Sequence, residues 1–451
     1  TFPELGAPFT LETNANLENF TRIADLLAAK SQRPGSLDYL PYESPGSAFA
    51  FWRTNGQNAS SSNAMAGPYV NWAELSEEMQ ASADLLAEIR SELEHPPRRF
   101  GWNLTNPFAP NQPRNPFVQK RKVAQFLAAD SMVALHENQL ARAQTNLHSF
   151  AQMTQIHRDD YLLISAMIRA AIAGLWVSET WQALQADGWS DGALAELQRD
   201  WEGLDLIASV ENGFIGERAF GQLSFALART DEAKADEILS AFGRSGSSSS
   251  ATRLAQLRDR LHERMAKFYW RGHIDEDEMF HLQDSQMQLE NLRKLRSNTS
   301  GASLRIKNQA QSDALEKAFE QPLAKYRYLL SSISIPNFTR ACDTALQRET
   351  ERRMVITVIA LKRYQLRNGH LPVALAELPP QFLSSELMDP WSGKLFHYRL
   401  NADGSFVLYS VGMDGRDDGG DPSPEKPGKT SKDMWSGKDA LWPKAIFPQA
   451  K

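Results

Sequence analysis

The sequence predicts a mainly α-helical protein that ends in a small α+β module with a short antiparallel sheet. Apolar residues recur at helical spacing through most of the first 350 residues. Near the C-terminus, two short apolar or alternating segments flank Asn401-Ala402-Asp403-Gly404, which is typical of a β-hairpin. The length of 451 residues suggests about two or three domains. We therefore expect a helical body over residues 1–350 and an α+β module over residues 351–451.

The composition is that of an ordinary globular protein. Hydrophobic residues make up 42% and charged residues 23% of the chain, which excludes a disordered protein. The formal net charge of −6 argues against a nucleic-acid partner, because general nucleic-acid binders carry a strongly basic face. The single cysteine, Cys342, can form neither an intrachain disulfide nor a cysteine-based zinc site. We expect it to be a buried structural residue.

The body is expected to be a series of helices joined by short breaks. Asn71, with Glu74 three residues later, is an N-cap signal for a helix that His95-Pro96-Pro97 ends. Ser190-Asp191 caps a further helix. Helical periodicity predicts other helices over about residues 117–150, 160–185, 204–229, 253–271 and 275–296. The short breaks favour antiparallel neighbours, as in a tetratricopeptide-like array of helical hairpins, although no strict 34-residue repeat is found.

Polar segments are expected to interrupt the helices in the second half of the body. The Gly/Ser-rich residues 243–252 predict a flexible break, and residues 297–303 predict a second one. Ser332–Asn337 contains a proline and is expected to interrupt the helix that precedes it. The next helix is predicted over Arg353–Arg367, where Asn368-Gly369 stops it, because these residues readily take the left-handed conformation.

No segment is a convincing membrane span. The longest apolar stretch, Leu162–Val177, is interrupted by Arg169 and is shorter than the roughly 20 residues that a span needs. This pattern predicts a buried helix. The sequence starts at Thr1 without a methionine, so we expect that an N-terminal segment has been removed. If that segment is a signal peptide or an anchor helix, the sequence is an exported domain.

Several blocks of local sequence in the predicted module follow one another in a distinctive order. They are ALKRYQLRNGHLP at 360–372, LAEL at 375–378, DPWSG at 389–393, FHY at 396–398, LYSVGMDG at 408–415 with GG at 419–420, and DALW at 439–442. In order and wording this segment resembles the globular domain of the major pseudopilin of type II secretion. A pseudopilin has an apolar helix directly before that domain, whereas here a long helical body stands in its place.

The resemblance implies an exported bacterial protein. We therefore expect an extracytoplasmic location, either periplasmic or at the cell surface, with a membrane tether through the removed N-terminal segment. It also implies calcium binding in the loop after the Tyr409-Ser410 strand, through the carboxylates of Asp414 and Asp439 and the carbonyl of Val411. Further candidate ligands in or next to this loop are Asp417, Asp418 and Asp421.

The residue types of this loop suit calcium but do not demand it. Calcium takes six to eight oxygen ligands in flexible geometry, and four aspartates lie between positions 414 and 421 with glycines among them. Aspartate and glycine are also ordinary turn residues, so a solvated turn without an ion is the alternative. If calcium binds, its role is expected to be structural, because it would tie the loop to the sheet.

Two other groups of residues could carry chemistry, and each has a simpler explanation. His281 lies four residues after Asp277 on one helical face, which could be half of a metal site or an acidic helix N-terminus. His157 with Asp159 and Asp160 could supply a base and an orienting acid, or it could be a junction between helices capped by an aspartate. We assign no catalytic residue.

These observations favour a non-enzymatic protein-interaction or structural protein. Its helical body would bind protein partners, and its calcium-stabilised, pseudopilin-like module suggests an association with a secretion or pilus-like system. The alternative is an extracytoplasmic hydrolase with an active-site cleft in the helical body. A pocket with a histidine–acid pair of shifted pKa would favour the enzyme.

Overall fold

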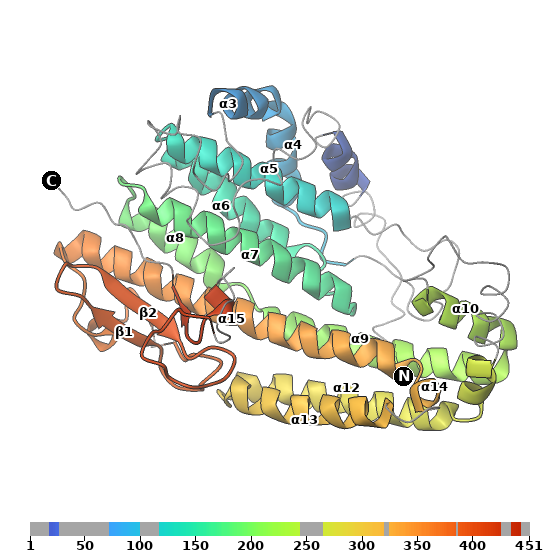
Figure 1. Cartoon of the computed structure of the whole chain (residues 1–451). Coiled ribbons are helices and arrows are strands. Elements are labelled where there is room, and N and C mark those ends of the chain that lie inside the picture. Colours follow the sequence, from blue (N-terminus) through green and yellow to red (C-terminus); the bar gives the residue numbers. More distant parts are fainter. Residues whose placement is uncertain are drawn as a thin grey trace, which may run out of the picture.

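The computed structural model describes residues 18–26, 72–99, 117–243, 265–319, 324–384, 387–424 and 434–442. Over these ranges the chain is mainly helical and has one three-stranded antiparallel sheet near its C-terminal end (Figure 1). The predicted fold class is therefore confirmed at the level of a helical body followed by a small α+β module. Most of the predicted break at 243–252 lies outside the described residues, as does the predicted N-cap Asn71.

Two predicted helices are each a pair of helices. The helix expected before His95 consists of α3 (Trp72–Ala81) and α4 (Ala83–Leu93). The helix expected over residues 117–150 consists of α5 (Phe117–His136) and α6 (Leu140–Gln155). Asn138, between α5 and α6, has a φ of 58°. Asparagine tolerates this left-handed conformation, so the chain reverses there although the apolar periodicity continues, and α5 packs against α6.

The next helices follow the prediction closely. They are α7 (Leu163–Gln185), α8 (Asp191–Glu202) and α9 (Leu206–Thr230). A further helix, α10 (Glu232–Gly243), was not predicted. The predicted cap is confirmed, because the Ser190 hydroxyl accepts a hydrogen bond from the amide of Ala193 at 3.1 Å. By length and composition α7 could cross a membrane, but 67% of its apolar stretch is buried inside the protein. This burial agrees with the predicted core helix.

The second half of the body contains one prediction that is wrong. Its helices are α12 (Ile274–Arg296), α13 (Gly301–Phe319), the short α14 (Ala324–Arg327) and α15 (Ser331–Asn368). The break expected at Ser332–Asn337 does not occur, because α15 runs through it as one helix of 38 residues. Pro336 lies near the N-terminal end of α15, where its missing N–H removes one hydrogen bond only.

Both ends of α15 are fixed by specific residues. At the start, the Asp277 carboxylate accepts hydrogen bonds from the amides of Leu330 and Ser331 at 3.0 and 3.1 Å. At the end, Gly369 takes a left-handed conformation with a φ of 80°, which confirms the predicted stop. The predicted boundary between residues 350 and 351 falls in the middle of this helix. Within the body, α15 packs against α7, α8, α9, α12 and α13 (Figure 1).

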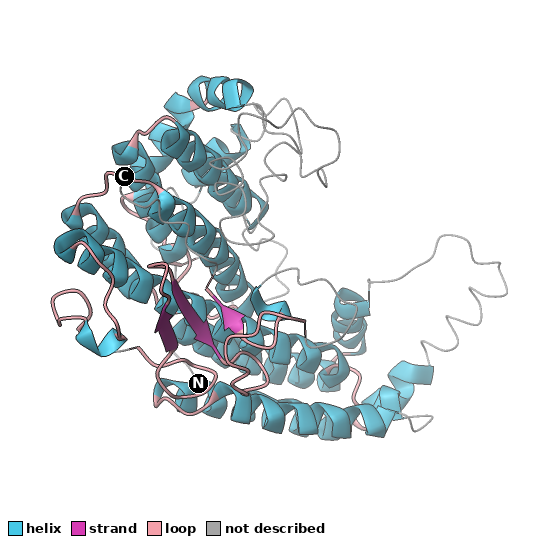
Figure 2. Ribbon diagram, turned by 60° about the vertical axis from the view of Figure 1, so that its left-hand side comes forward, coloured by secondary structure: helices cyan, strands magenta, loops and turns pink. Residues whose placement is uncertain are grey.

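The C-terminal module contains the predicted hairpin. Strand β1 (His397–Leu400) pairs antiparallel with β2 (Phe406–Ser410), and β2 pairs with the short β3 (Ala440–Leu441). Gly404 in the turn has a φ of 80°, which supports the glycine-based turn signal. Two 3₁₀ helices, Leu375–Glu377 and Met434–Ser436, complete the module. Figure 2 shows the sheet lying against the helices.

The module shares the hydrophobic cores of the body. Phe396, Phe406 and Trp442 of the module belong to the core that is built mainly from α5, α6, α7, α8 and α15. Trp391 and Val411 belong to a second core with residues of α9, α12, α13 and α15, which also contains the buried Cys342. The body and the module are therefore packed as one unit.

Helix α9 approaches the chain before α7 very closely at two glycines. A Cβ atom at Gly216 would lie 1.7 Å from the carbonyl oxygen of Tyr161, and one at Gly213 would lie 2.8 Å from the Cα of Leu163. Both obstacles are backbone atoms, which cannot rotate away as a side chain can. Glycine at these positions therefore determines how closely α9 and the start of α7 can pack.

We expect Gly216→Ala to lower the free energy of unfolding by about 3 kcal/mol, because the backbones must separate to admit the methyl group. Denaturant titration of the purified protein measures this effect. Gly192→Ala is the matched control, since its Cβ would have only the Ser190 hydroxyl at 3.8 Å nearby. Equal stabilities of the two variants would contradict the close approach of the two backbones.

Candidate functional site

The loop that follows β2 contains the predicted calcium ligands, and Asp439 organises it. Asp439 is 1% exposed, and its carboxylate accepts hydrogen bonds from three backbone amides of the loop. The donors are Asp418, Gly420 and Asp421, at 3.1, 2.8 and 3.1 Å from Oδ2. In this arrangement Asp439 is a carboxylate held by N–H groups, which fasten the loop to β3.

The other predicted carboxylates also bind hydrogen-bond donors. Asp414 accepts the amide of Arg416 at 3.0 Å, which closes an Asx turn. Asp417 accepts the hydroxyl of Tyr409 at 3.0 Å and the amide of Gly419 at 2.9 Å. These contacts are typical of a loop stabilised by its own side chains.

Asp421 pairs with a cation and not with other carboxylates. Its Oδ2 lies 2.8 Å from Nζ of Lys438, and its Oδ1 accepts the amide of Ser423 at 2.9 Å. These hydrogen bonds, with that from Lys438 the largest, lower the pKa of Asp421 to about 2. The pKa of Asp417 is also lowered, chiefly by the hydrogen bond from the amide of Gly419. The side chains of Lys438 and Asp421 are 38% and 34% exposed, so this ion pair adds little stability.

Sequence reasoning missed Asp389, which is the most buried carboxylate among the described residues of the module. It is 0% exposed and accepts hydrogen bonds from the amide of Trp391, the hydroxyl of Ser410 and the amide of Val411, at 3.0, 2.7 and 3.3 Å. Val411, whose carbonyl was a predicted ligand, is thus held by its amide to Asp389. The only signal in the sequence was the turn-like block Asp389-Pro390-Trp391.

The predicted ligands do not converge on a cation site in this structure. Across the described ranges, no group of three histidine, cysteine or acidic side chains could hold a metal ion. In this structure the carboxylate of Asp439 accepts backbone amides, mainly through Oδ2. Calcium binding stays a prediction.

Asp277 and His281, which could have been half of a metal site, do not form one among the described residues. The Asp277 carboxylate, besides capping α15, accepts the indole N–H of Trp270 at 2.7 Å. His281 lies against α9, because its Nε2 is 2.3 Å from the position of a Cβ at Gly221. Burial lowers the pKa of His281 to about 4. Asp277 also lies in the first turn of α12 with Asp275 and Glu276, which agrees with the simpler explanation of an acidic helix N-terminus. Its role as the cap of α15 was not predicted.

A buried polar cluster lies where the start of α5 meets the loop between α6 and α7. We call it the Lys120 cluster, and it consists of Lys120, His157, Asp160, Ser165 and Arg169, which are between 0% and 9% exposed. Nζ of Lys120 is 2.5 Å from Nδ1 of His157. Asp160 accepts the hydroxyl of Ser165 at 2.8 Å and lies 3.7 Å from His157. Nε of Arg169 donates to the carbonyl of Thr154.

Burial dominates the electrostatics of the Lys120 cluster. The pKa of Lys120 is lowered to about 7, chiefly by burial; Asp160 opposes this shift and Arg169 adds to it. Burial, with Lys120 and Arg169, also holds the pKa of His157 well below its usual 6.5. The pKa of Arg169 falls to about 10, chiefly through burial. At neutral pH His157 is therefore unprotonated, whereas Arg169 keeps its charge.

The Lys120 cluster contains the predicted His157–Asp160 pair, but solvent hardly reaches it. His157 and Ser165 are each 1% exposed, so a substrate could not contact them in this conformation. The amide of Asp159, the other predicted acid, donates to the carbonyl of Arg98 at 3.0 Å. The arrangement matches the predicted junction between helices, but the N-cap of α7 is Leu162 and not one of the two aspartates.

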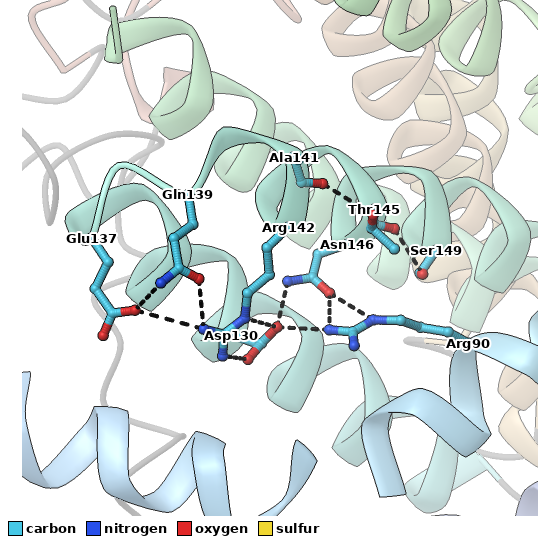
Figure 3. Close-up of polar contacts among 9 residues, drawn as sticks. All are labelled: Arg90, Asp130, Glu137, Gln139, Ala141, Arg142, Thr145, Asn146 and Ser149. Atoms are coloured by element: carbon cyan, nitrogen blue, oxygen red, sulfur yellow. Dashed lines mark hydrogen bonds and ion pairs between the residues drawn. The ribbon is translucent and has the colours of Figure 1, made fainter. Parts of the chain in front are cut away.

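Another buried carboxylate, Asp130 of α5, joins three helices (Figure 3). Arg90 of α4 and Asn146 of α6 each donate to its Oδ2 at 2.7 Å, and Arg142 of α6 also pairs with it. Asp130 is 1% exposed. Two guanidinium groups and one side-chain amide bind this single carboxylate and connect the helices, so we assign this cluster a structural role. A single aspartate in an otherwise apolar run was its only sequence signal.

Comparisons with known proteins do not assign the chain to a family. No family model, no curated protein and no solved structure matches it. The resemblance of the module to a pseudopilin thus stays a prediction that rests on its sequence blocks.

Proposed function

We propose that the chain is a non-enzymatic protein-interaction protein that works outside the cytoplasm. Its helical body, a tetratricopeptide-like array of hairpins, would present a surface to protein partners. Its C-terminal, pseudopilin-like module would be stabilised by calcium and would associate with a secretion or pilus-like system. An N-terminal segment would tether the protein to a membrane.

The observation that best supports this proposal is that the body and the module share hydrophobic cores and are joined by hydrogen bonds. The start of α13 is capped by the module, because the amides of Gly301 and Ala302 donate to the carbonyls of Pro390 and Trp391 at 2.9 and 3.2 Å. In addition, the guanidinium of Arg353 on α15 donates to the carbonyl of Met388 at 2.8 Å. A partner that binds a module joined in this way would keep one orientation relative to the body, as a scaffold requires.

The alternative is an extracytoplasmic hydrolase with a cleft in the helical body. One observation favours it, namely the contact of Asp160 with both His157 and Ser165. A panel of ester, peptide and glycoside substrates tests it, with His157→Gln as the control. Turnover by the wild type that His157→Gln abolishes would overturn the non-enzymatic proposal, whereas no turnover by either protein would support it.

Calcium binding by the module is tested by thermal unfolding in calcium and in excess chelator. If the prediction is right, a hundredfold excess of calcium over its Kd raises the free energy of unfolding by about 2.7 kcal/mol. Asp414→Ala is expected to abolish this gain. Unfolding curves that are identical with calcium and with chelator would contradict the prediction.

Asp403→Ala is the matched control for the calcium experiment. Like Asp414, Asp403 precedes a glycine and accepts the amide two residues later, that of Ser405, at 2.9 Å. It lies in the hairpin turn and is not a predicted ligand. Its variant should lose the stability of one turn and keep the full response to calcium.

The proposed location is tested in cells that express the whole gene product from its natural start. Fractionation followed by protease treatment of intact spheroplasts distinguishes the two sides of the membrane. Degradation of the membrane-bound protein would support an extracytoplasmic, tethered protein. A protected protein in the soluble cytoplasmic fraction would overturn that part of the proposal.

A further inference from the structure

The Lys120 cluster joins three segments that are distant in sequence. Lys120 lies in the first turns of α5, and His157 lies in the loop between α6 and α7. The same loop holds the segment after α4, because the amides of His157 and Asp159 donate to the carbonyls of Pro97 and Arg98 at 2.8 and 3.0 Å. His157 has a φ of 62°, a conformation that its surroundings must maintain.

Charged groups of both signs surround the contact between Lys120 and His157. Asp160 is the carboxylate that acts on Lys120, while Arg169 on α7 acts on both Lys120 and His157 as a second cation. Arg169 in turn faces Arg158, Asp159 and Asp205. Among the described residues, no salt bridge joins Lys120 to a carboxylate. Within the Lys120 cluster itself Asp160 is the one acid, so a proton on His157 adds a positive charge beside Lys120 and Arg169.

We propose that the contact between Lys120 and His157 is a proton-operated latch that fastens the start of α5 to the loop between α6 and α7. The latch is closed when Nδ1 of His157 is unprotonated, because the amine of Lys120 can then donate a hydrogen bond to it. A proton on Nδ1 removes that acceptor and places two cations in contact in a buried site. Acid therefore releases the loop, and with it the segment 96–99.

Linkage gives the direction and the steepness of the response. The closed form binds protons more weakly than the open form, so lowering the pH favours opening. Lys120 contributes to the pH dependence of opening between pH 10.5 and about 7, where it is protonated in the open form of the protein and not in the closed form. His157 contributes as the pH falls below 6.5. In each range one proton taken up on opening changes the opening equilibrium by about tenfold per pH unit.

Amide hydrogen exchange of the full chain over a pH series tests the latch. After correction for intrinsic exchange rates, protection of residues 96–99 and 157–162 should fall in two phases, each by about tenfold per pH unit. The amides in the middle of α8 serve as the internal reference. If the two segments kept the same protection relative to α8 at every pH, the latch would be refuted.

Three variants assign the phases to residues. Lys120→Met should remove the phase above pH 7, whereas His157→Gln, which keeps an acceptor for Lys120, should remove the phase below pH 6.5. His148→Gln is the control, because His148 is exposed and pairs with Asp200 at 2.9 Å. Two phases that persist in His157→Gln would overturn the proposal, even if Lys120→Met failed to fold.

Discussion

Replacing Asp130 with asparagine is expected to lower the free energy of unfolding by about 3 kcal/mol. Asp130 is 1% exposed and carries the negative charge shared by Arg90 and Arg142. Removing one partner of a buried ion pair costs about 3–5 kcal/mol, because the remaining charge is left without compensation. Both guanidinium groups are partly exposed and can regain water, so we expect the lower end of that range. Denaturant titration measures the change.

The control for Asp130 is an ion pair of the same kind at the surface. Glu88 pairs with Arg22 at 2.6 Å, and both side chains are more than 40% exposed. Glu88→Gln should change the free energy of unfolding by less than about 1 kcal/mol. If Asp130→Asn cost no more than Glu88→Gln, burial would not matter to this cluster, and its structural role would be refuted.

Replacing Lys120 with methionine is expected to have the opposite effect and to stabilise the protein at pH 7 by about 3 kcal/mol. A pKa lowered from 10.5 to about 7 means that burial of this amine costs about 4 kcal/mol at pH 7. Methionine avoids that cost. The variant also loses the hydrogen bond to His157, which reduces the gain in stability by about 1 kcal/mol. Methionine has a similar length and no charge, so it suits the buried position.

The pH dependence distinguishes this explanation from better packing of methionine. Between pH 7 and 10.5 the unfolded wild type binds more protons than the folded one, so its stability rises with pH. The variant lacks that rise, and its advantage should shrink and vanish near pH 10.5. Unfolding free energies measured at pH 7, 8.5 and 10 test this. An advantage that is the same at all three values would refute a titrating Lys120.

Elements with local signals could be predicted from the sequence, and elements set by distant contacts could not. The cap at Ser190, the stop at Gly369 and the turn at Gly404 each depend on a few neighbouring residues. The reversal at Asn138 has no such signal, because the apolar periodicity continues across it. The continuity of α15 past Pro336 was missed because the position of a proline within a helix decides its cost.

The candidate sites divide in the same way. The aspartates of the module could be assigned to one loop, but their hydrogen-bond donors depend on tertiary folding. Asp439 binds the amide of Asp418, which is 21 positions away, and Asp389 binds Val411, which is 22 positions away. Lys120 and His157 are 37 positions apart. A single sequence does not show which polar residues of a helical protein meet across such distances.

The length of α15 has a mechanical consequence. Its 38 residues form a rod of about 57 Å. One end of the rod carries the module, and the rest lies between helices of the body. We expect a force on the module to reach the body as shear along this rod, spread over many packed side chains at once. A linker in its place would bear the same load as tension and yield residue by residue.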